Sequence, residues 1–225
     1  PLPNGNVLAV NTVPGRTLVY ELEAETRDRV WQQNFSITDT HDVDLINGDQ
    51  LLVANMREYN NNNGTSNDRL FIYDLSEDKI VWEWYFKNHY PSETDGGMND
   101  DWSHVNDVDK IEDGKYLVSP RNFDQVIVVN RSTKNITMQL GADQKHTILN
   151  EQHDPQYLES QTGTPTVLVA DSENDRIVEY SCVNRSETGE CQWKQVWVMG
   201  DDQLNWPRDA DRLPNGNTLI VDSLG

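Results

Sequence analysis

Residues with catalytic potential recur at one point of a repeated segment in this sequence. Three of the five histidines, His41, His104 and His153, lie in short segments that contain an aspartate and stand just before a hairpin. Imidazoles brought together could bind Zn²⁺, or could act as a nucleophile and as donors that stabilise negative charge. Arg121 adds a planar cation suited to a forked contact with an oxyanion. Because a buried guanidinium would repel a metal dication, this set favours a sulfate or phosphate group over a metal ion.

Four segments of this kind share one aspartate, and the residues before it differ. The shared position holds Asp42, Asp107, Asp154 and Asp209. A residue that recurs in every repeat is expected to be structural, with its carboxylate bonded to the backbone of a neighbouring strand. The position before it and the position two residues further upstream vary, so they can be specialised for function. The variable residues are His41, Asn106, His153 and Arg208, and, further upstream, Asp39, His104, Glu151 and Trp206.

Aromatic and polar residues beside these positions are candidates for binding a substrate. We select Trp102, Asn106, Trp206 and Arg208. The two indoles could stack on an aromatic substrate, or they could pack between sheets. The sequence leaves both roles open.

The elements that must position these residues are hairpins. Asn-Gly or Asp-Gly supplies the positive φ of a type I′ turn, and a β-branched run follows it. Five copies of a turn and its following strand can be aligned, and they begin at Pro3, Ile46, Glu112, Gly163 and Pro214. Each candidate segment precedes such a turn. It is therefore expected to be the innermost strand of a four-stranded unit that faces a central channel.

The repeat predicts the fold class. Periods of roughly 40–50 residues with four strands each are typical of β-propeller blades, and no segment has the length and period of a helix. We predict an all-β fold, a β-propeller of four-stranded antiparallel blades in a single domain at 1–225. The approximate blades are 1–36, 37–92, 93–145, 146–200 and a partial one at 201–225, about four and a half in all. Since such a ring is unfinished, we expect further sequence beyond these ends.

The composition is strongly acidic. Asp and Glu number 38 against 18 Lys and Arg, which gives a formal net charge of −20. This charge repels phosphate backbones and anionic membrane surfaces, so we exclude nucleic-acid binding. Seven Trp, eight Tyr and many aliphatic runs exclude a disordered acidic chain. A folded protein with an acidic hydrated surface is expected of a halophilic organism, with an ordinary acidic surface protein as the alternative.

Sequons and cysteines indicate an extracellular or cell-surface location. Five Asn-x-Ser/Thr sequons predict a glycoprotein, and they lie at Asn34, Asn63, Asn130, Asn135 and Asn184. Cys182 and Cys191 flank a polar loop, so we expect a disulfide at the base of one hairpin; a metal site is the weaker alternative. The sequence contains no signal peptide and no membrane-spanning run, and we expect any such segment, including an anchor, to lie outside it.

Several of these segments resemble the arylsulfotransferase family. Residues 101–108, 117–121 and 151–154 are similar to its signature series, and 169–176 and 205–211 are similar to its haloarchaeal members. The resemblance covers essentially the whole chain and is strongest from residue 101 onward. It implies a six-bladed propeller that moves a sulfuryl group from a phenolic sulfate ester to another phenol, without a nucleotide donor, a metal or another cofactor.

The resemblance also implies a role for each matched residue. His153 matches the histidine that attacks sulfur and becomes transiently sulfated. His104 and Arg121 match the groups that hold the sulfuryl oxygens, and His41 matches a further histidine. A neutral imidazole is a competent nucleophile near neutral pH, and fixed cationic donors stabilise charge on a transferring group, so the implied chemistry agrees with the residue types.

Two other functions remain open at this point. The first is a non-catalytic surface module that binds a glycan, a peptide or a cell-envelope partner through its loops. The second is a metal-dependent hydrolase resembling a lactonase, which would require a divalent ion beside acidic residues. Convergence of the candidate side chains on one anion would favour the sulfotransferase, and wide separation would argue against it.

Overall fold

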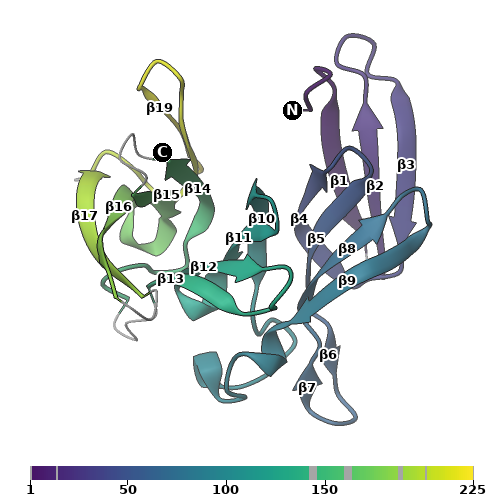
Figure 1. The fold of residues 1–225 in the computed structure, drawn as a ribbon, viewed down its shortest axis with the longest axis horizontal. Helices are drawn as coiled ribbons and strands as arrows, with labels where there is room; N and C mark the ends of the chain where they lie inside the picture. Colours follow the sequence, from purple (N-terminus) through teal and green to yellow (C-terminus); the bar gives the residue numbers. More distant parts are fainter. Residues whose placement is uncertain are drawn as a thin grey trace. The chain divides into compact units, whose positions relative to one another are not determined.

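The computed structural model describes residues 2–13, 15–141, 146–159, 164–186, 190–200 and 202–224. Among these described residues, the regular elements are strands, shown in Figure 1, and four short 3₁₀ helices. The chain divides into two compact units, Pro1–Lys110 and Ile111–Gly225, which are described separately below.

The first unit contains two antiparallel sheets. The first sheet has the order β1-β2-β3, with β1 at Val7–Val13, β2 at Arg16–Leu22 and β3 at Arg29–Phe35. The second has the order β4-β5-β8-β9, with β4 at Asp39–Ile46, β5 at Gln50–Met56, β8 at Arg69–Asp74 and β9 at Lys79–Tyr85. The 3₁₀ helices η1 (Phe86–Asn88) and η2 (Thr94–Gly96) follow it.

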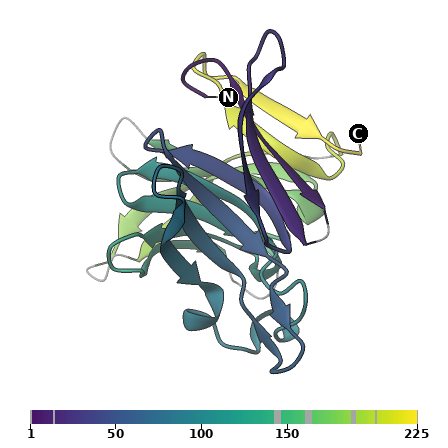
Figure 2. The ribbon, with the colours of Figure 1, turned by 90° about the vertical axis from the view of Figure 1, so that its right-hand side faces the viewer.

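A small hairpin interrupts the second sheet. It consists of β6 (Tyr59–Asn60) and β7 (Thr65–Ser66), and it projects away from the strands that it separates in both views (Figure 1, Figure 2). The asparagine-rich tip of this hairpin is exposed.

The second unit repeats the same strand plan. A sheet with the order β10-β11-β12-β13 includes β10 (Val105–Glu112), which spans the division, β11 (Lys115–Pro120), β12 (Gln125–Asn130) and β13 (Ile136–Gly141). The next sheet has β14 (His153–Glu159), β15 (Pro165–Asp171), β16 (Arg176–Arg185) and β17 (Cys191–Met199) in that order. A final pair consists of β18 (Pro207–Arg212) and β19 (Thr218–Asp222). The helices η3 (Arg121–Phe123) and η4 (Ser172–Asn174) follow β11 and β15.

These sheets confirm the predicted four-stranded antiparallel blades, in which the strands pair in chain order, with the β6-β7 hairpin set between β5 and β8. The predicted innermost segments become β4, β10, β14 and β18, each the first strand of its sheet. The turn between β4 and β5 has φ of 55° at Asn47 and 83° at Gly48, as a type I′ hairpin requires.

The core lies between stacked sheets, and this explains the apolar runs of the second and third strands. In the first unit, Leu51 and Val53 of β5 are fully buried and pack with Val19, Phe35 and Phe71. Strands that are covered on both faces have continuous rather than alternating apolar residues. Each such side chain contributes roughly 1.5–3 kcal/mol by its removal from water.

In the first unit, the carboxylate of the repeated aspartate accepts a hydrogen bond from the backbone of a neighbouring strand. The backbone N–H of Val108 donates to Asp42 Oδ2 at 3.1 Å, and that of Lys110 donates to Asp44 Oδ2 at 3.1 Å. In the second unit the N–H of Arg212 donates to Gln156 Oε1 at 2.7 Å, and Gln156 occupies the repeat position of Asp44. The predicted structural role of Asp42 is therefore confirmed.

The disulfide prediction is also confirmed, because Cys182 of β16 is bonded to Cys191 of β17. No helix among the described residues is long and apolar enough to cross a membrane. Within the same residues, no group of three or more His, Cys, Asp or Glu is arranged to hold a metal ion.

Candidate functional site

In the second unit, His153 lies at the start of β14 and is only 9% exposed. The pairing of β14 with β15 shifts register between His153 and Gln156, which marks a β-bulge. A bulge breaks the regular alternation of side chains and turns the local residues toward a new direction. Similar shifts lie at two of the other variable positions, between Thr40 and Val43 in β4 and between Pro207 and Asp209 in β18.

Both ring nitrogens of His153 have polar neighbours. Nδ1 lies 2.8 Å from the Oγ atom of Ser172, the first residue of η4. Ser172 is fully buried, and its Oγ lies 2.6 Å from the carbonyl oxygen of Pro207. The other nitrogen, Nε2, contacts the guanidinium of Arg208.

Arg208 is held in place by an aromatic ring. Its guanidinium carbon lies 3.7 Å from the ring centroid of Trp206, and the indole N–H of Trp206 donates to Glu173 Oε1 at 2.8 Å. A cation stacked on an indole is stabilised by roughly 0.5–2 kcal/mol. One face of the Trp206 ring is therefore covered by Arg208 and not presented to a substrate.

A second guanidinium lies in the same neighbourhood. Arg121, the first residue of η3, forms an ion pair with Glu151 and donates from its NH1 group to Asn122 Oδ1 at 2.9 Å. Burial lowers the pKa of Arg208, and the charge of Arg121 lowers this pKa further. Arg208 thus contacts the imidazole of His153 and also interacts electrostatically with Arg121, and a group of this kind is complementary to a tetrahedral anion.

Three of the variable upstream residues have a strained, left-handed backbone conformation. His104, Glu151 and Trp206 occupy the same repeat position, and all three have left-handed backbone φ, at 39°, 48° and 62°. A non-glycine residue in this region costs roughly 1–3 kcal/mol and persists where the surroundings hold it. In the second unit that support is visible, since the N–H of Glu151 donates to Asp124 Oδ1 and that of Trp206 to Asp175 Oδ1, both at 2.8 Å.

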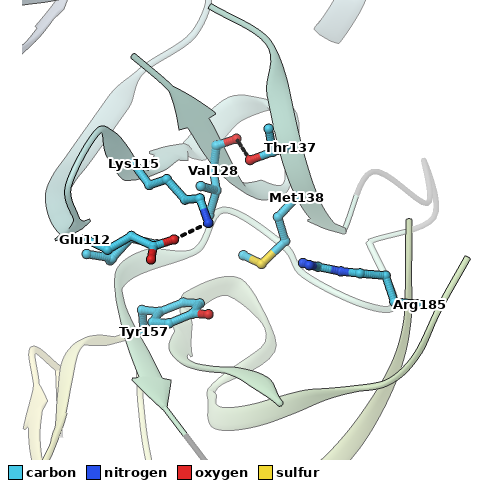
Figure 3. Close-up of a pocket in the computed structure, with 8 residues that line it drawn as sticks. Glu112, Lys115, Val128, Thr137, Met138, Tyr157 and Arg185 are labelled. Carbon is cyan, nitrogen blue, oxygen red and sulfur yellow. Dashed lines mark hydrogen bonds and ion pairs between the residues drawn. The ribbon is translucent and has the colours of Figure 1, made fainter. Parts of the chain in front are cut away.

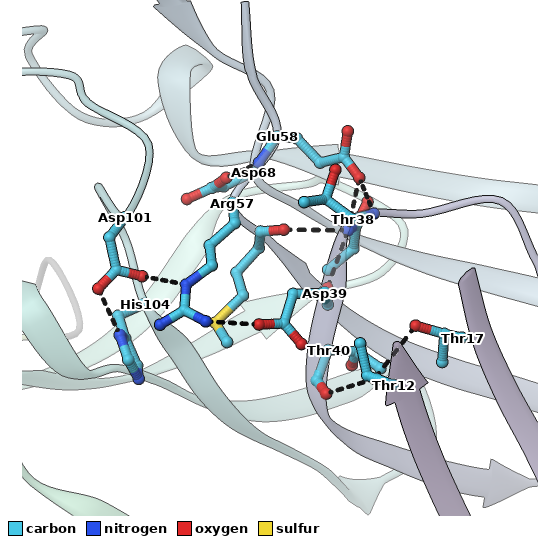
Figure 4. Close-up of polar contacts among 12 residues, drawn as sticks. Thr12, Thr17, Thr38, Asp39, Thr40, Arg57, Glu58, Asp68, Asp101 and His104 are labelled. Carbon is cyan, nitrogen blue, oxygen red and sulfur yellow. Dashed lines mark hydrogen bonds and ion pairs between the residues drawn. The ribbon is translucent and has the colours of Figure 1, made fainter. Parts of the chain in front are cut away.

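The first unit brings His41 and His104 together. Their ring centroids lie 5.0 Å apart with the planes almost perpendicular, at 88°. His104 Nδ1 lies 2.9 Å from Asp101 Oδ2 (Figure 4). Arg57 bridges two carboxylates, with Nε 2.8 Å from Asp101 Oδ1 and NH1 2.7 Å from Asp39 Oδ2. A chain of charged side chains, formed by Asp101, Arg57 and Asp39, therefore leads away from His104.

Electrostatics separates the two histidines of this pair. Desolvation of the His41 ring and the neighbouring charge of His104 lower the pKa of His41 to about 4, although the residue as a whole is exposed. Burial would raise the pKa of Asp101, but hydrogen bonds from Arg57 and His104 outweigh it and lower this pKa. The carboxylate of Asp101 therefore stays ionised beside His104, while His41 stays neutral.

The segment that leads to His104 is anchored by a buried carboxylate. The N–H and the hydroxyl of Ser103 both donate to Asp68 Oδ2, at 3.1 and 2.6 Å. Trp102 is 0% exposed, and its indole N–H donates to the carbonyl of Thr94 at 2.8 Å. Trp102 is therefore packed in the interior and has no exposed face on which a substrate could stack. Asn106 is also buried, within β10.

The sequons lie mainly on the surface. Asn34, Asn63, Asn135 and Asn184 are exposed, and Asn130 is half-buried. The Oδ1 atom of Asn130 accepts from the N–H groups of Ser132 and Thr133, at 3.0 and 2.9 Å. Glycosylation at these asparagines stays a prediction.

A small pocket of about 70 Å³ lies elsewhere in the second unit (Figure 3). Lys115, Glu112, Met138, Tyr157 and Arg185 are among the residues that line it, and Lys115 pairs with Glu112. None of the residues predicted to act in catalysis lines this pocket.

Sequence reasoning missed Ser172, Glu173, Asp101 and Arg57 as parts of these clusters. One signal could have found Ser172. The segments after β11 and β15 share the same plan, a 3₁₀ helix ended by a left-handed aspartate at Asp124 or Asp175, and Arg121 and Ser172 are its first residues. The repeat that singles out Arg121 therefore singles out Ser172.

Comparison with solved structures shows the fold. The chain is similar to the β-propeller domain of Myceliophteria thermophila Cps50, with a TM-score of 0.59 and 13% identity over 98% of this chain and 64% of that one. It is also similar to a functionally unknown protein from Desulfotomaculum acetoxidans, with a TM-score of 0.55 and 10% identity over 97% of this chain and 59% of that one. The WD40 β-propeller domain of Doa1 gives a TM-score of 0.56 at 11% identity, over 95% of this chain and 60% of that one. The chain thus has the predicted β-propeller fold and spans about three fifths of the length of these structures.

Comparison of sequences places the chain in a family. No curated protein matches it significantly. A family model, described as Arylsulfotransferase (ASST), matches residues 5–203 and so includes His41, His104, Arg121 and His153. The chain therefore belongs to the arylsulfotransferase (ASST) family.

Proposed function

We propose that this chain belongs to an aryl sulfotransferase that moves a sulfuryl group between phenolic compounds through a sulfated His153. The observation that supports this most is the grouping of His153 with two guanidinium groups, those of Arg208 and Arg121, in one unit. A phenolic sulfate ester is the proposed donor and a phenol the proposed acceptor. Family membership supports this class of reaction.

The proposed reaction has two displacements at sulfur. In the first, the Nε2 lone pair of His153 attacks sulfur, an N–S bond forms, and the bond from sulfur to the donor's phenolic oxygen breaks. The donor leaves as a phenolate and takes a proton from solvent. In the second, the acceptor oxygen attacks sulfur, the N–S bond breaks with its electron pair returning to Nε2, and the acceptor proton goes to solvent.

The guanidinium groups supply charge stabilisation. In the transition state the transferring group spreads negative charge over its three sulfuryl oxygens while further charge develops on the leaving phenolic oxygen, and fixed cations are complementary to it. By analogy with oxyanion holes, loss of one such donor costs roughly 10²–10³ in rate. Arg121 and Arg208 are the proposed donors of the second unit.

His104 and His41 have proposed roles in the same reaction. Asp101 favours a positively charged His104 ring, which suits it to stabilise anionic oxygens. The neutral state of His41 suits it to donate or accept a hydrogen bond without adding charge. We also propose that the protein is glycosylated, comes from a halophilic organism and is located outside the cell or at its surface.

The alternative is a surface propeller that binds a partner through its loops and has no sulfotransferase activity. The test measures release of a fluorescent phenol from its sulfate ester by the full-length protein in high salt, with and without a second phenol. We expect release that the acceptor stimulates and that His153→Ala abolishes. His89→Gln is the matched control, because the ring of His89 is stacked on Trp84, with 4.4 Å between the ring centroids, and His89 is not among the candidate residues.

Trapping tests the proposed intermediate directly. Incubation with donor and no acceptor, followed by rapid acid-free digestion and mass spectrometry, should give a sulfated peptide that contains residue 153. Folded protein that releases no phenol from several aryl sulfates would favour the binding module instead.

A further inference from the structure

We propose that Ser172 is a positioning residue that fixes the tautomer of His153 and thereby selects Nε2 as the atom that attacks sulfur. This inference rests on the proposed function for its catalytic consequence, but its structural content can be tested without turnover.

The hydroxyl of Ser172 has one proton and two close neighbours. Its Oγ lies 2.6 Å from the carbonyl oxygen of Pro207 and 2.8 Å from Nδ1 of His153. The carbonyl can only accept, so the hydroxyl proton points to Pro207. The Oγ lone pair must then accept from His153, and this requires a proton on Nδ1.

The contact that Nε2 makes with Arg208 leads independently to the same tautomer. Nε2 of His153 faces the guanidinium of Arg208, which can only donate, and the same guanidinium nitrogen is farther from Nδ1, at 3.5 Å. Nε2 therefore carries a lone pair and no proton, and this lone pair becomes available for attack when the sulfuryl oxygens replace it as the acceptor for Arg208. A proton on Nε2 would place two donors against each other, and a second ring proton would also place a cation beside the Arg208 charge.

The chemical nature of the partner matters as much as its position. A serine hydroxyl orients the ring without adding charge, so the ring stays neutral and nucleophilic. Once sulfur is bonded to Nε2, the proton on Nδ1 makes the ring cationic and a better leaving group for the second displacement. The chain from Nδ1–H through Ser172 Oγ to the Pro207 carbonyl stabilises that charge without removing the proton.

The place of Ser172 in the fold is consistent with a specialised residue. Ser172 begins η4, at the repeat position that Arg121 occupies at the start of η3. A purely structural alternative also exists, in which the hydroxyl only ties η4 to the backbone of Pro207. The two readings differ in what they predict for the His153 ring.

The first measurement is the tautomer in the full-length wild-type protein, by ¹⁵N NMR after histidine labelling, with His153→Gln used to assign the signal. We expect a protonated Nδ1 and an unprotonated Nε2 at neutral pH. A proton on Nε2 in the wild type would overturn the inference whether or not the protein is active. A wild type with the expected tautomer and no transfer activity would overturn the proposed function alone.

The second measurement uses Ser172→Ala and Ser172→Thr. We expect Ser172→Ala to mix the two tautomers and to lower kcat by roughly 10–100-fold, as the loss of a ring-orienting partner does elsewhere, with KM little changed. Ser172→Thr keeps the hydroxyl and should restore most of the rate and the single tautomer. Unchanged tautomer and kcat in folded Ser172→Ala would overturn the inference, and if that variant does not fold, the wild-type spectrum and Ser172→Thr still decide it.

Discussion

His153 in the second unit and His104 in the first are both held through Nδ1, but by partners of different charge. The partner of His153 is the neutral hydroxyl of Ser172, and that of His104 is the carboxylate of Asp101. The opposite side of the His153 ring meets the Arg208 cation, whereas the His104 ring packs against the neutral ring of His41. Two residues of the same type thus have partners of opposite electrostatic character.

The surroundings of each histidine agree with this division. Asp101 is kept ionised by Arg57 and His104, which lower its pKa against the effect of burial, so a positive charge on His104 is balanced. A positive charge on His153 would meet Arg208 with no carboxylate on its Nδ1 contact. Environments that differ in charge are the usual way in which residues of the same type obtain different chemical roles.

The largest expected effect contrasts the two histidines directly. His153→Ala removes the proposed nucleophile and should lower kcat by more than about 10⁴-fold, because His153 is the group that forms the proposed covalent intermediate. His104→Ala removes one charge-stabilising donor and should cost roughly 10²–10³ in rate. Single-turnover phenol release measures both, and equal losses would break the comparison.

A smaller effect is expected from the carboxylate behind His104. Asp101→Asn keeps the shape but cannot balance an imidazolium, so we expect kcat/KM to fall by roughly 10–100-fold and the remaining activity to move toward lower pH. Arg57→Gln serves as a control, because it removes the other partner of Asp101 and leaves the carboxylate beside His104. An unchanged pH profile in Asp101→Asn would contradict a charged His104.

A third test concerns the support of Arg208. Trp206→Leu removes the ring that lies 3.7 Å from the guanidinium carbon. Loss of roughly 1 kcal/mol of cation–π energy corresponds to about a fivefold lower affinity for the anion. We expect this as a higher KM for the donor and weaker inhibition by inorganic sulfate. Trp31→Leu, in the first unit, is the matched aromatic control. A fall in kcat alone would assign Trp206 a different role.

The smallest effect is on stability and follows from the pKa of His41, which is about 4 in the folded protein against an ordinary value of 6.5. The unfolded chain binds this proton first as the pH falls, so the contribution of His41 to stability is complete above pH 6.5 and is lost as the pH falls through 4. His41→Gln should flatten the stability profile in this window, as measured by urea unfolding at several pH values. Because the residue is exposed, the difference should be modest, and an unchanged slope would argue against desolvation of the ring.

The sequence predicts more of the fold than of the site because the fold is encoded in local patterns. Asn47-Gly48 specifies a hairpin within a few residues, and the cysteines that form the disulfide are separated by only 9 positions. The placing of His153, His104 and Arg121 near strand ends follows from the same repeat. Such features need only the neighbouring residues and the preference of β-branched side chains for strands.

What the tertiary structure decided is the partner of each functional side chain. Ser172 lies 19 positions from His153, Arg208 lies 55 positions from it, and Arg57 lies 44 positions from Asp101. The repeat by itself determined that this protein is a propeller with histidines at the first strands of its blades. Which partner each nitrogen of His153 contacts, and which histidine faces a carboxylate, was decided only by β-bulges and residues with left-handed backbone φ, because these redirect side chains through long-range backbone hydrogen bonds that no local pattern records.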